Sequence, residues 1–315
     1  MSLESTPGLQ VLGPAEITAR LPWPRLIAAI AAGLAVPITA PPRHYHYPEN
    51  SHDLLLLMPA WTQGRWLGAK ASAMLPNSPG RSAGGYLLFD RKLGTLAAVL
   101  DGVALTNRRT AAASALAAMA LARADATRLL VLGSGPLAEA LAEAHASVRA
   151  YTSIAVWART PAGAQAMAAR LAAKGLPARA VADAQAAAGE ADVIASATAS
   201  PAPVLRGAWL RPGCHVDLVG AHEPAAREAD SDLVAMAALY ADVRANVLRE
   251  AGDIIIPLTE GRITADALRG ELTDLIGKSP ADLRSAEAIT LFKSTGFAAL
   301  DMIAATAALG LELKG

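Results

Sequence analysis

The sequence predicts an α/β protein in which a domain with a parallel sheet is joined to a discontinuous α+β domain. Three observations support this prediction. From residue 127 to about 245, apolar strand patterns alternate with Ala-rich helix patterns, which indicates βαβ units. A Gly-rich turn separates the first of these strands from the first helix. The first 105 residues instead contain short strand patterns separated by Pro-Gly and Gly-Gly turns, which indicates an antiparallel or mixed sheet.

In the first region, a buried helix is expected from residue 26, followed by a turn into a strand near residue 40. Five further strands are expected at residues 54–58, 66–70, 85–89, 94–100 and 102–106, followed by an Ala-rich helix from Arg109 to about Arg123. The last apolar stretch, 296–311, predicts a helix that returns to this domain. The predicted domains are therefore 1–120 completed by 296–315, and 121–295.

The second region predicts a Rossmann-type sheet. Its strands are expected at residues 127–132, 153–159, 178–181, 192–198, 214–220 and 238–242, with the last of these closing the series. In the first of these strands, the run of Leu and Val lacks polar alternation, which is typical of a parallel strand with both faces covered.

Composition limits the classes of partner. The chain has 315 residues, of which 53% are hydrophobic, and its 28 basic residues balance its 28 acidic ones. No basic stripe indicates nucleic acid or an anionic membrane as a partner. The start of the chain has no signal-peptide pattern, and the longest apolar stretch is interrupted by Pro37 and is too short to span a bilayer. The single cysteine, Cys214, fits a buried site in a reducing compartment, so a cytoplasmic location is expected.

The Gly-rich turn has the G-x-G-x-x-A form of a dinucleotide-binding fingerprint: Gly133, Ser134, Gly135, Pro136, Leu137 and Ala138. Gly133 would form the tight turn, Gly135 would let the backbone approach a pyrophosphate, and Ala138 would let the helix pack close to the strand. The helix N-terminus would favour the negative charge. The alternative is an ordinary tight turn that needs two glycines.

The end of the next strand bears on the choice of cofactor. An acid there would bind the ribose 2′-hydroxyl of NAD, but the sequence has Arg159 followed by Thr160. A guanidinium pairs with a 2′-phosphate, so NADPH is favoured and NADH is the alternative. A solvated surface arginine is the simpler interpretation of Arg159.

Three cations lie beside apolar segments of the first domain: Arg43, Lys70 and Arg109. Each is a solvated or snorkelling side chain by default, but together they would form a site for a small carboxylate. The six histidines lack metal-ligand spacing, and no motif for a covalent nucleophile is present, so no metal site is expected.

The chain resembles the ornithine cyclodeaminase/μ-crystallin family over nearly its whole length. The resemblance is carried by the fingerprint and by residues 57–60 (LMPA), 67–70 (LGAK), 87–90 (LLFD), 101–102 (DG), 105–113 (LTNRRTAAA), 191–194 (ADVI), 197–200 (ATAS), 219–220 (VG), Pro224, 227–228 (RE) and 290–296 (TLFKSTG). It implies a homodimer with a substrate and dimerisation domain. It also implies that Arg43 and Arg109 bind the substrate carboxylate and that Lys70 lies beside the reacting carbon–nitrogen centre. The residues expected to contact the cofactor are those of the fingerprint, together with Arg159, Thr160, Thr198 and Ser294.

Two departures from the family pattern bear on the activity. Where ornithine cyclodeaminases carry an aspartate after Val-Gly-x, this chain has His222, and where they carry a glutamate before Met-Pro, it has Leu56. Neither residue balances the ammonium group of ornithine. The Val-Gly-Ala-His-x-Pro pattern resembles the ketimine reductases of the family, which act in proline metabolism.

The resulting prediction is an NAD(P)H-dependent reductase that converts Δ1-pyrroline-2-carboxylate to L-proline and Δ1-piperideine-2-carboxylate to L-pipecolate. Lys70 or His222 would donate the proton, or His222 would only fill a loop. The alternatives are an ornithine cyclodeaminase that recycles NAD, an alanine or open-chain imine dehydrogenase, and a non-catalytic NADPH-binding protein of the μ-crystallin kind.

Overall fold

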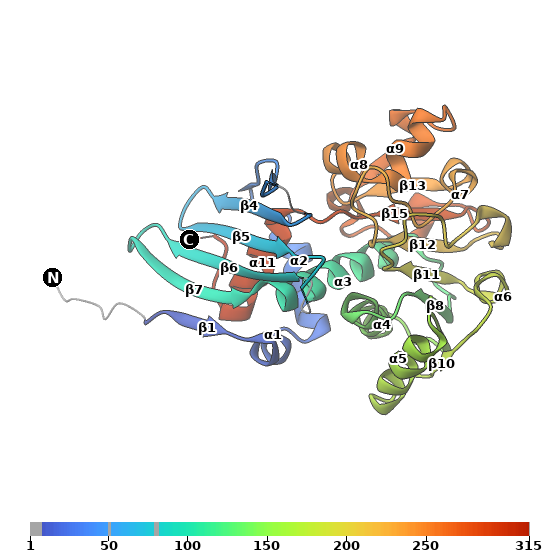
Figure 1. Cartoon of the computed structure of the whole chain (residues 1–315), viewed down its shortest axis with the longest axis horizontal. Coiled ribbons are helices and arrows are strands. Elements are labelled where there is room, and N and C mark those ends of the chain that lie inside the picture. Colours follow the sequence, from blue (N-terminus) through green and yellow to red (C-terminus); the bar gives the residue numbers. More distant parts are fainter. Residues whose placement is uncertain (1–7, 50–51, 79–81, 315) are drawn as a thin grey trace. The chain divides into compact units, whose positions relative to one another are not determined.

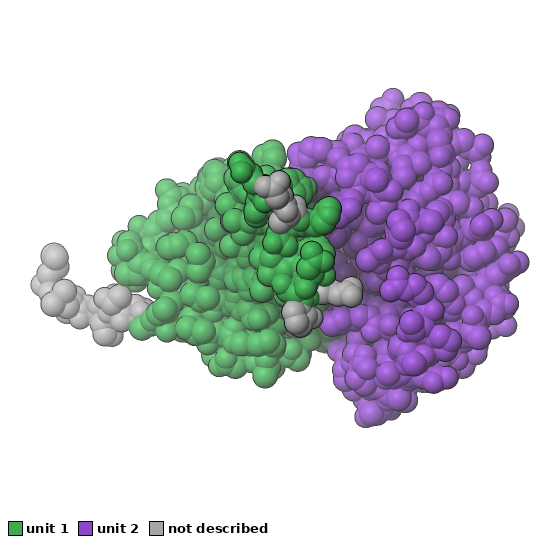
Figure 2. Space-filling view, viewed as in Figure 1, with its two compact units in different colours: residues 1–109, 297–315 green, residues 110–296 purple. Residues whose placement is uncertain are grey.

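The computed structural model describes residues 8–49, 52–78 and 82–314. The start of the chain, on which the signal-peptide expectation depends, lies outside these residues. The chain divides into two compact units (Figure 2): unit 1 contains residues 1–109 and 297–315, and unit 2 contains residues 110–296. The first division falls at residue 109, whereas the sequence placed it at 120. None of the described helices is both long and apolar enough to cross a membrane.

Unit 1 contains a seven-stranded mixed sheet in the order β1-β7-β6-β5-β4-β2, with β3 also paired to β4 (Figure 1). Only β1 and β7 pair in parallel among these strands. The elements are β1 (Gln10–Leu12), α1 (Pro14–Arg20), α2 (Trp23–Gly33), β2 (Ile38–Thr39), β3 (His44–His46), β4 (Leu54–Thr62), β5 (Trp66–Met74), β6 (Ser82–Asp90), β7 (Thr95–Asp101), the start of α3 (Gly102–Leu121) and α11 (Ala298–Leu309).

The helix α11 forms the core of unit 1. It packs against β4, β5 and β6 and against α2. Along β4 and β6, alternate side chains are buried, among them Met58, Tyr86 and Leu88. This period of two identifies the sheet face that α11 covers.

The strand predicted at residues 102–106 is wrong, because these residues form the first turns of α3. Asp101 is the last residue of β7, and its carboxylate accepts a hydrogen bond from the amide of Ala104 at 2.7 Å. A side chain that satisfies a free amide of the first turn stabilises a helix start. Arg109, expected at the beginning of the helix, therefore lies about two turns inside it.

Unit 2 contains an eight-stranded, all-parallel sheet in the order β10-β9-β8-β11-β12-β15-β13-β14. Its elements are the rest of α3, β8 (Arg128–Leu132), α4 (Pro136–Val148), β9 (Ser153–Trp157), α5 (Pro161–Ala173), β10 (Ala178–Ala180), α6 (Ala184–Glu190), β11 (Val193–Ser196), β12 (His215–Leu218), α7 (Ser231–Met236), β13 (Ala238–Ala241), α8 (Arg244–Glu250), α9 (Gly252–Thr259), β14 (Leu268–Glu271), α10 (Pro280–Leu283) and β15 (Thr290–Lys293). The predicted fold class, a Rossmann-type domain beside an α+β domain, is confirmed.

The prediction that the strand at 238–242 closes the series is wrong. β14 and β15 follow it, and β15 lies between β12 and β13. β15 begins with Thr290 and ends with Lys293, and it has only two apolar residues between them. Both polar residues are fully buried. Their polar atoms are paired inside the protein, and such pairing is the condition under which burial of a polar side chain is tolerated.

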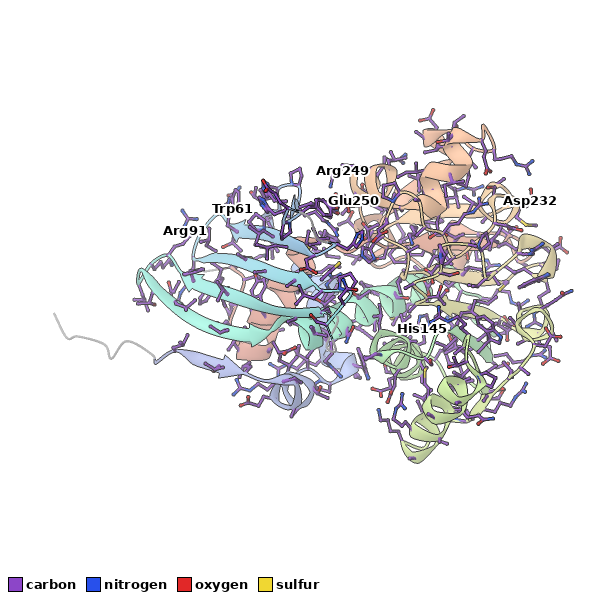
Figure 3. The ribbon with its side chains drawn as sticks, viewed as in Figure 1. Trp61, Arg91, His145, Asp232, Arg249 and Glu250 are labelled. Carbon is purple, nitrogen blue, oxygen red and sulfur yellow. The ribbon has the colours of Figure 1, made fainter. Side chains whose placement is uncertain are left out.

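A buried polar cluster links α4 to β12. His145 (Figure 3) has Nε2 at 3.2 Å from Oδ2 of Asp217, and Nε2 of His215 lies 3.3 Å from the other oxygen of that carboxylate. Burial by itself raises the pKa of Asp217, but the two imidazoles outweigh it and hold that pKa below its usual value. These two histidines thus have a structural role in the core of unit 2.

Candidate active site

The fingerprint turn joins β8 to α4 in unit 2. Gly133 has φ of 119°, and a Cβ on it would lie 2.6 Å from the carbonyl oxygen of Ala197. Only glycine fits this turn. Gly135 caps α4, and a Cβ built on it meets no atom within 4 Å, so the space beside its backbone is open. An open helix N-terminus of this kind favours a bound phosphate.

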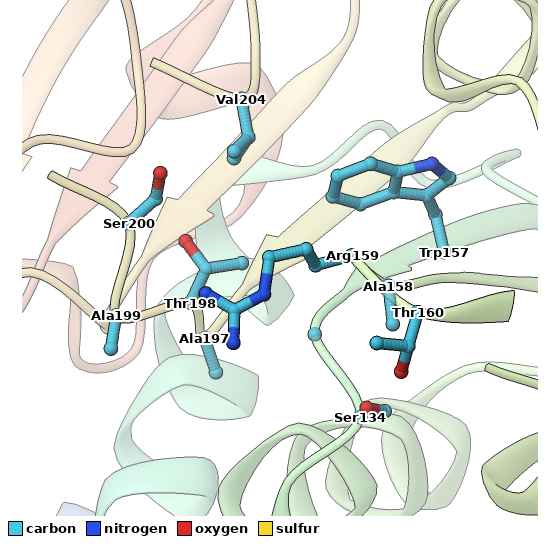
Figure 4. A pocket seen from close by; sticks show the side chains of 11 residues that line it. Ser134, Trp157, Ala158, Arg159, Thr160, Ala197, Thr198, Ala199, Ser200 and Val204 are labelled. Carbon is cyan, nitrogen blue, oxygen red and sulfur yellow. The ribbon is translucent and has the colours of Figure 1, made fainter. Parts of the chain in front are cut away.

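A cavity of about 260 Å³ lies beside this turn (Figure 4). It is formed by the segments that follow β8, β9 and β11. This is where the strand order reverses, and ligands of open α/β sheets bind at such a point. The lining residues are Gly133, Ser134, Trp157, Ala158, Arg159, Thr160, Ala197, Thr198, Ala199, Ser200 and Val204.

Arg159 contributes the one charged side chain among these lining residues. It is exposed, and it forms no hydrogen bond or ion pair with any residue that the structure describes. None of the described residues that line the cavity is an acid. An unpaired guanidinium at the mouth of a cavity without acids suits an anionic group rather than a bare ribose diol.

The predicted cofactor residues fall into two groups. Gly133, Ser134, Arg159, Thr160 and Thr198 line the cavity, whereas Gly135, Pro136, Leu137 and Ser294 are outside its lining. Ser294 is buried, and its hydroxyl donates to Asp242 at 2.8 Å. The same carboxylate accepts the amides of Thr295 and Gly296, so Asp242 fixes the turn that follows β15.

The buried side chain of Glu228 fixes the loops after β11 and β12. Its Oε1 accepts the hydroxyl of Ser196 at 2.6 Å and both the amide and the hydroxyl of Thr198, at 2.7 and 2.9 Å. Its Oε2 accepts the amides of Gly220 and Ala221, at 2.7 and 3.2 Å. One carboxylate therefore holds the cavity residue Thr198 and the segment that leads to His222.

A buried ion pair between Lys293 and Asp253 helps to hold Glu228 in place. Lys293 donates to Asp253 at 2.8 Å and to the carbonyl of Ala221 at 2.6 Å. Asp253 in turn accepts the amides of Glu228 and Ala229. Burial raises the pKa of Glu228, and the positive charge of Lys293 opposes that effect.

In unit 1, two of the predicted cations are brought together. Lys70 on β5 and Arg109 on α3 are each 3% exposed, and both contact Asp301 on α11. Nζ of Lys70 lies 3.2 and 3.1 Å from the two carboxylate oxygens, and Nε of Arg109 donates at 3.0 Å. Lys70 also contacts the hydroxyl of Thr106 at 3.2 Å.

Burial lowers the pKa of Lys70 to about 8, against the opposing charge of Asp301. The charges of Arg109 and Arg43 lower it further, so the half-buried Arg43 acts on the same centre. For Asp301, burial raises the pKa, but Arg109 and Lys70 outweigh burial and hold the pKa below its usual value. The site can therefore carry an excess of positive charge and a lysine that gains and loses its proton near neutral pH.

His222 belongs to unit 2 and follows β12. It is half-buried, and its Nδ1 lies 3.2 Å from the carbonyl oxygen of Gly220. A role for it in proton transfer stays a prediction.

Sequence reasoning missed Asp301 and the function of Glu228. Asp301 is the one acid in the apolar run of α11, and a lone buried acid indicates a buried cationic partner. That signal was present in the sequence. Glu228 could not be recognised, because three of its five hydrogen bonds come from Ser196 and Thr198, which lie 32 and 30 residues earlier in the chain.

A model of the Ornithine cyclodeaminase/mu-crystallin family matches residues 25–309. The chain belongs to this family. The family resemblance found in the motifs is thereby confirmed.

Two relatives and one solved structure illustrate the similarity. The chain is 36% identical to the Δ1-pyrroline-2-carboxylate reductase of Paracoccus denitrificans, over 94% of this chain and 95% of that protein. It is 36% identical to the ketimine reductase mu-crystallin of Mus musculus, over 70% of this chain and 66% of that protein. The Thermococcus litoralis Δ1-pyrroline-2-carboxylate reductase in complex with NADH and L-proline matches with a TM-score of 0.90, 29% identity and 96% of each chain covered.

Proposed function

We propose that this protein is an NAD(P)H-dependent reductase of cyclic imino acids that converts Δ1-pyrroline-2-carboxylate to L-proline and Δ1-piperideine-2-carboxylate to L-pipecolate. The observation that carries the proposal is that the buried cations Lys70 and Arg109 meet at Asp301 in a protein that also has a nucleotide fingerprint. Relatives named for this activity, which cover nearly the whole chain, support it.

The residues of unit 2 fit a nicotinamide dinucleotide. Gly133 places no side chain in the fingerprint turn. The open N-terminus of α4 would hold the pyrophosphate. When bound, the reduced cofactor supplies the hydride that the C=N carbon accepts. For the form of the cofactor we propose NADPH, because the unpaired Arg159 suits a 2′-phosphate and no acid lines the cavity to bind a 2′-hydroxyl. NADH is the alternative.

The residues of unit 1 would hold the substrate and supply a proton. Nη1 of Arg109 is buried and has no hydrogen-bond partner in the described part of the chain, so it can donate to the substrate carboxylate. Arg43 would share that carboxylate. A protonated imine is the better electrophile, and the ammonium of Lys70, with a pKa of about 8, can give its proton to the ring nitrogen near neutral pH.

The residues at positions 56 and 222 argue against a lyase that deaminates ornithine. Leu56 is buried on β4, two residues before Met58, whose strand partner is Lys70. His222 stands where the lyases carry an aspartate. An apolar side chain and an imidazole leave the second ammonium of ornithine without a counter-charge, and an unpaired buried ammonium is costly.

We also propose a homodimer formed through the face of the unit 1 sheet opposite α11. That face is apolar, and its side chains are half-buried or exposed, with Leu55 40% and Leu67 38% exposed. Paired neighbours continue the row across the strands: Pro59, Ala69, Leu87, Val99 and Val11. Trp61 of β4 (Figure 3) lies beside this row. Contiguous apolar surface of this kind is typical of a protein interface.

The test of the proposed activity is the oxidation of NADPH and of NADH, followed at 340 nm, with five- and six-membered cyclic imino acids and with pyruvate plus amines. We expect turnover of the cyclic substrates and formation of proline or pipecolate. Activity confined to pyruvate plus ammonia would favour an open-chain imine dehydrogenase. Ammonia release from ornithine with NAD would favour the lyase.

A further inference from the structure

We infer that Asp301 is a positioning residue for this reductase: it holds Lys70 and Arg109 together and keeps the lysine available as the proton donor. The inference rests on the proposed function and adds a residue from the C-terminal helix to its machinery.

The geometry shows one carboxylate shared by two cations. Asp301 is fully buried on α11, 231 residues along the chain from Lys70 and 192 from Arg109. Both carboxylate oxygens lie within 3.2 Å of Nζ of Lys70, and Oδ1 also accepts from Nε of Arg109. The strand β5 and the helices α3 and α11 thus meet at one pair of oxygens. Sites built on rigid elements hold their geometry best.

The contact of Asp301 with Arg109 uses Nε and leaves another edge of the guanidinium available. Nη1 is buried and has no hydrogen-bond partner among the described residues. A planar guanidinium can bind two carboxylates through different edges. The inner carboxylate of Asp301 would fix the plane of the guanidinium, and Nη1 would face the carboxylate of the substrate.

The charges around Lys70 explain why an acid is needed there. Five groups face Lys70: Asp301 from α11, Arg109 and Thr106 from α3, Tyr86 from the neighbouring strand β6, and Arg43. With Lys70 included, three of these six groups are cations, and Asp301 supplies the one negative charge among them. Like charges at such a site favour the neutral amine. Without Asp301, the protonated form of Lys70 would be lost at a lower pH than in the native site.

A purely structural role for Asp301 predicts a different outcome when this residue is replaced. Removing one partner of a buried pair destabilises the fold wherever it lies. Only a positioning role also shifts the pH dependence of the reaction and lowers kcat while leaving NADPH affinity in place, because the cofactor cavity belongs to unit 2.

The experiment compares Asp301→Asn and Asp301→Glu in the full chain. For Asp301→Asn, kcat/KM for Δ1-pyrroline-2-carboxylate should fall about 100-fold at pH 8, and the alkaline decline should move down by about one pH unit. Asp301→Glu keeps the charge but moves it by one methylene, so the decline should stay near pH 8 while kcat falls. The matched control is Thr306→Val, a buried substitution on the same helix whose hydroxyl bonds only to backbone carbonyls of α11. It should leave both quantities unchanged.

A second measurement does not depend on turnover. The chain has six lysines, so ¹³C-labelled lysine can be followed by NMR and Lys70 assigned with Lys70→Arg. Its titration should lie near pH 8 in the wild type and lower in Asp301→Asn. An unchanged titration, or a wild-type kcat in Asp301→Glu, would overturn the inference. A wild type that reduces no imino acid but shows the expected titration would overturn the proposed function alone.

Discussion

Glu228 provides the sharpest prediction for unit 2, because one carboxylate accepts five hydrogen bonds. In Glu228→Gln, one oxygen becomes an NH₂ group of nearly the same size. If the NH₂ replaced Oε2, it would face the amides of Gly220 and Ala221, which can only donate. If it replaced Oε1, the hydroxyls of Ser196 and Thr198 could rotate to accept, and only the amide of Thr198 would lose its acceptor. The second orientation is therefore the less costly one.

The magnitude follows from that single lost bond. One buried amide without an acceptor costs about 1–3 kcal/mol of stability. Because the amide belongs to Thr198, which lines the cavity, the dissociation constant for NADPH should also rise about 5-fold or more. Thermal unfolding and NADPH fluorescence titration measure the two effects.

The matched control is Glu250→Gln. Glu250 is also buried and accepts a hydrogen bond from the side chain of Arg249, and neither residue lines the cavity. It should alter stability without altering NADPH affinity. If Glu228→Gln bound NADPH as the wild type does and unfolded at the same temperature, the reasoning about this carboxylate would be refuted.

Four further predictions concern the cofactor, the proton and the core. Arg159→Ala should raise KM for NADPH about 10-fold or more with little change for NADH, and an equal change for both would contradict a 2′-phosphate contact. The kcat/KM of the wild type should fall as pH rises through about 8, since the Lys70 ammonium loses its proton there, and a flat profile to pH 10 would exclude this donor. His222→Ala should keep that decline, whereas Lys70→Met should abolish turnover; a decline lost with His222 would assign the proton to the histidine instead. Lys293→Met should lower the stability of unit 2 by about 3–5 kcal/mol, because it leaves Asp253 buried and unpaired, which denaturant unfolding would detect.

The sheet of unit 2 was largely predictable because its strands are buried on both faces. The apolar runs of β8 and β11 contrast with the helices around them, and two glycines mark the turn after β8. β15 was missed because burial there is made possible by specific polar partners. Lys293 is hidden by Asp253, which no local pattern reveals.

Local pattern also failed at the beginning of α3. Residues 102–106 follow a strand and have strand-like composition, yet the amide of Ala104 is capped by Asp101 and the chain turns into a helix. The capping acid was visible in the sequence. Five residues contain too little periodicity to distinguish a strand from the first turns of a helix.

Individual residues of the candidate site could be predicted only where they belong to a sequence motif. Lys70 and Arg109 were identified as cations of one site, but the carboxylate that joins them comes from the other end of the chain. Arg159 was identified from its place after β9, and the structure adds that no acid lines its cavity. Ser294 was expected at the cofactor, whereas its hydroxyl bonds to Asp242.

The most direct test of the proposed reduction is to follow the hydride itself. The protein is supplied with Δ1-pyrroline-2-carboxylate and NADPH that carries deuterium at both C4 positions of the nicotinamide, and the product is examined by mass spectrometry and proton NMR. We predict L-proline with one deuterium at C2 and an equal amount of NADP⁺. Proline without deuterium, or no consumption of NADPH while ornithine releases ammonia, would contradict a reductase.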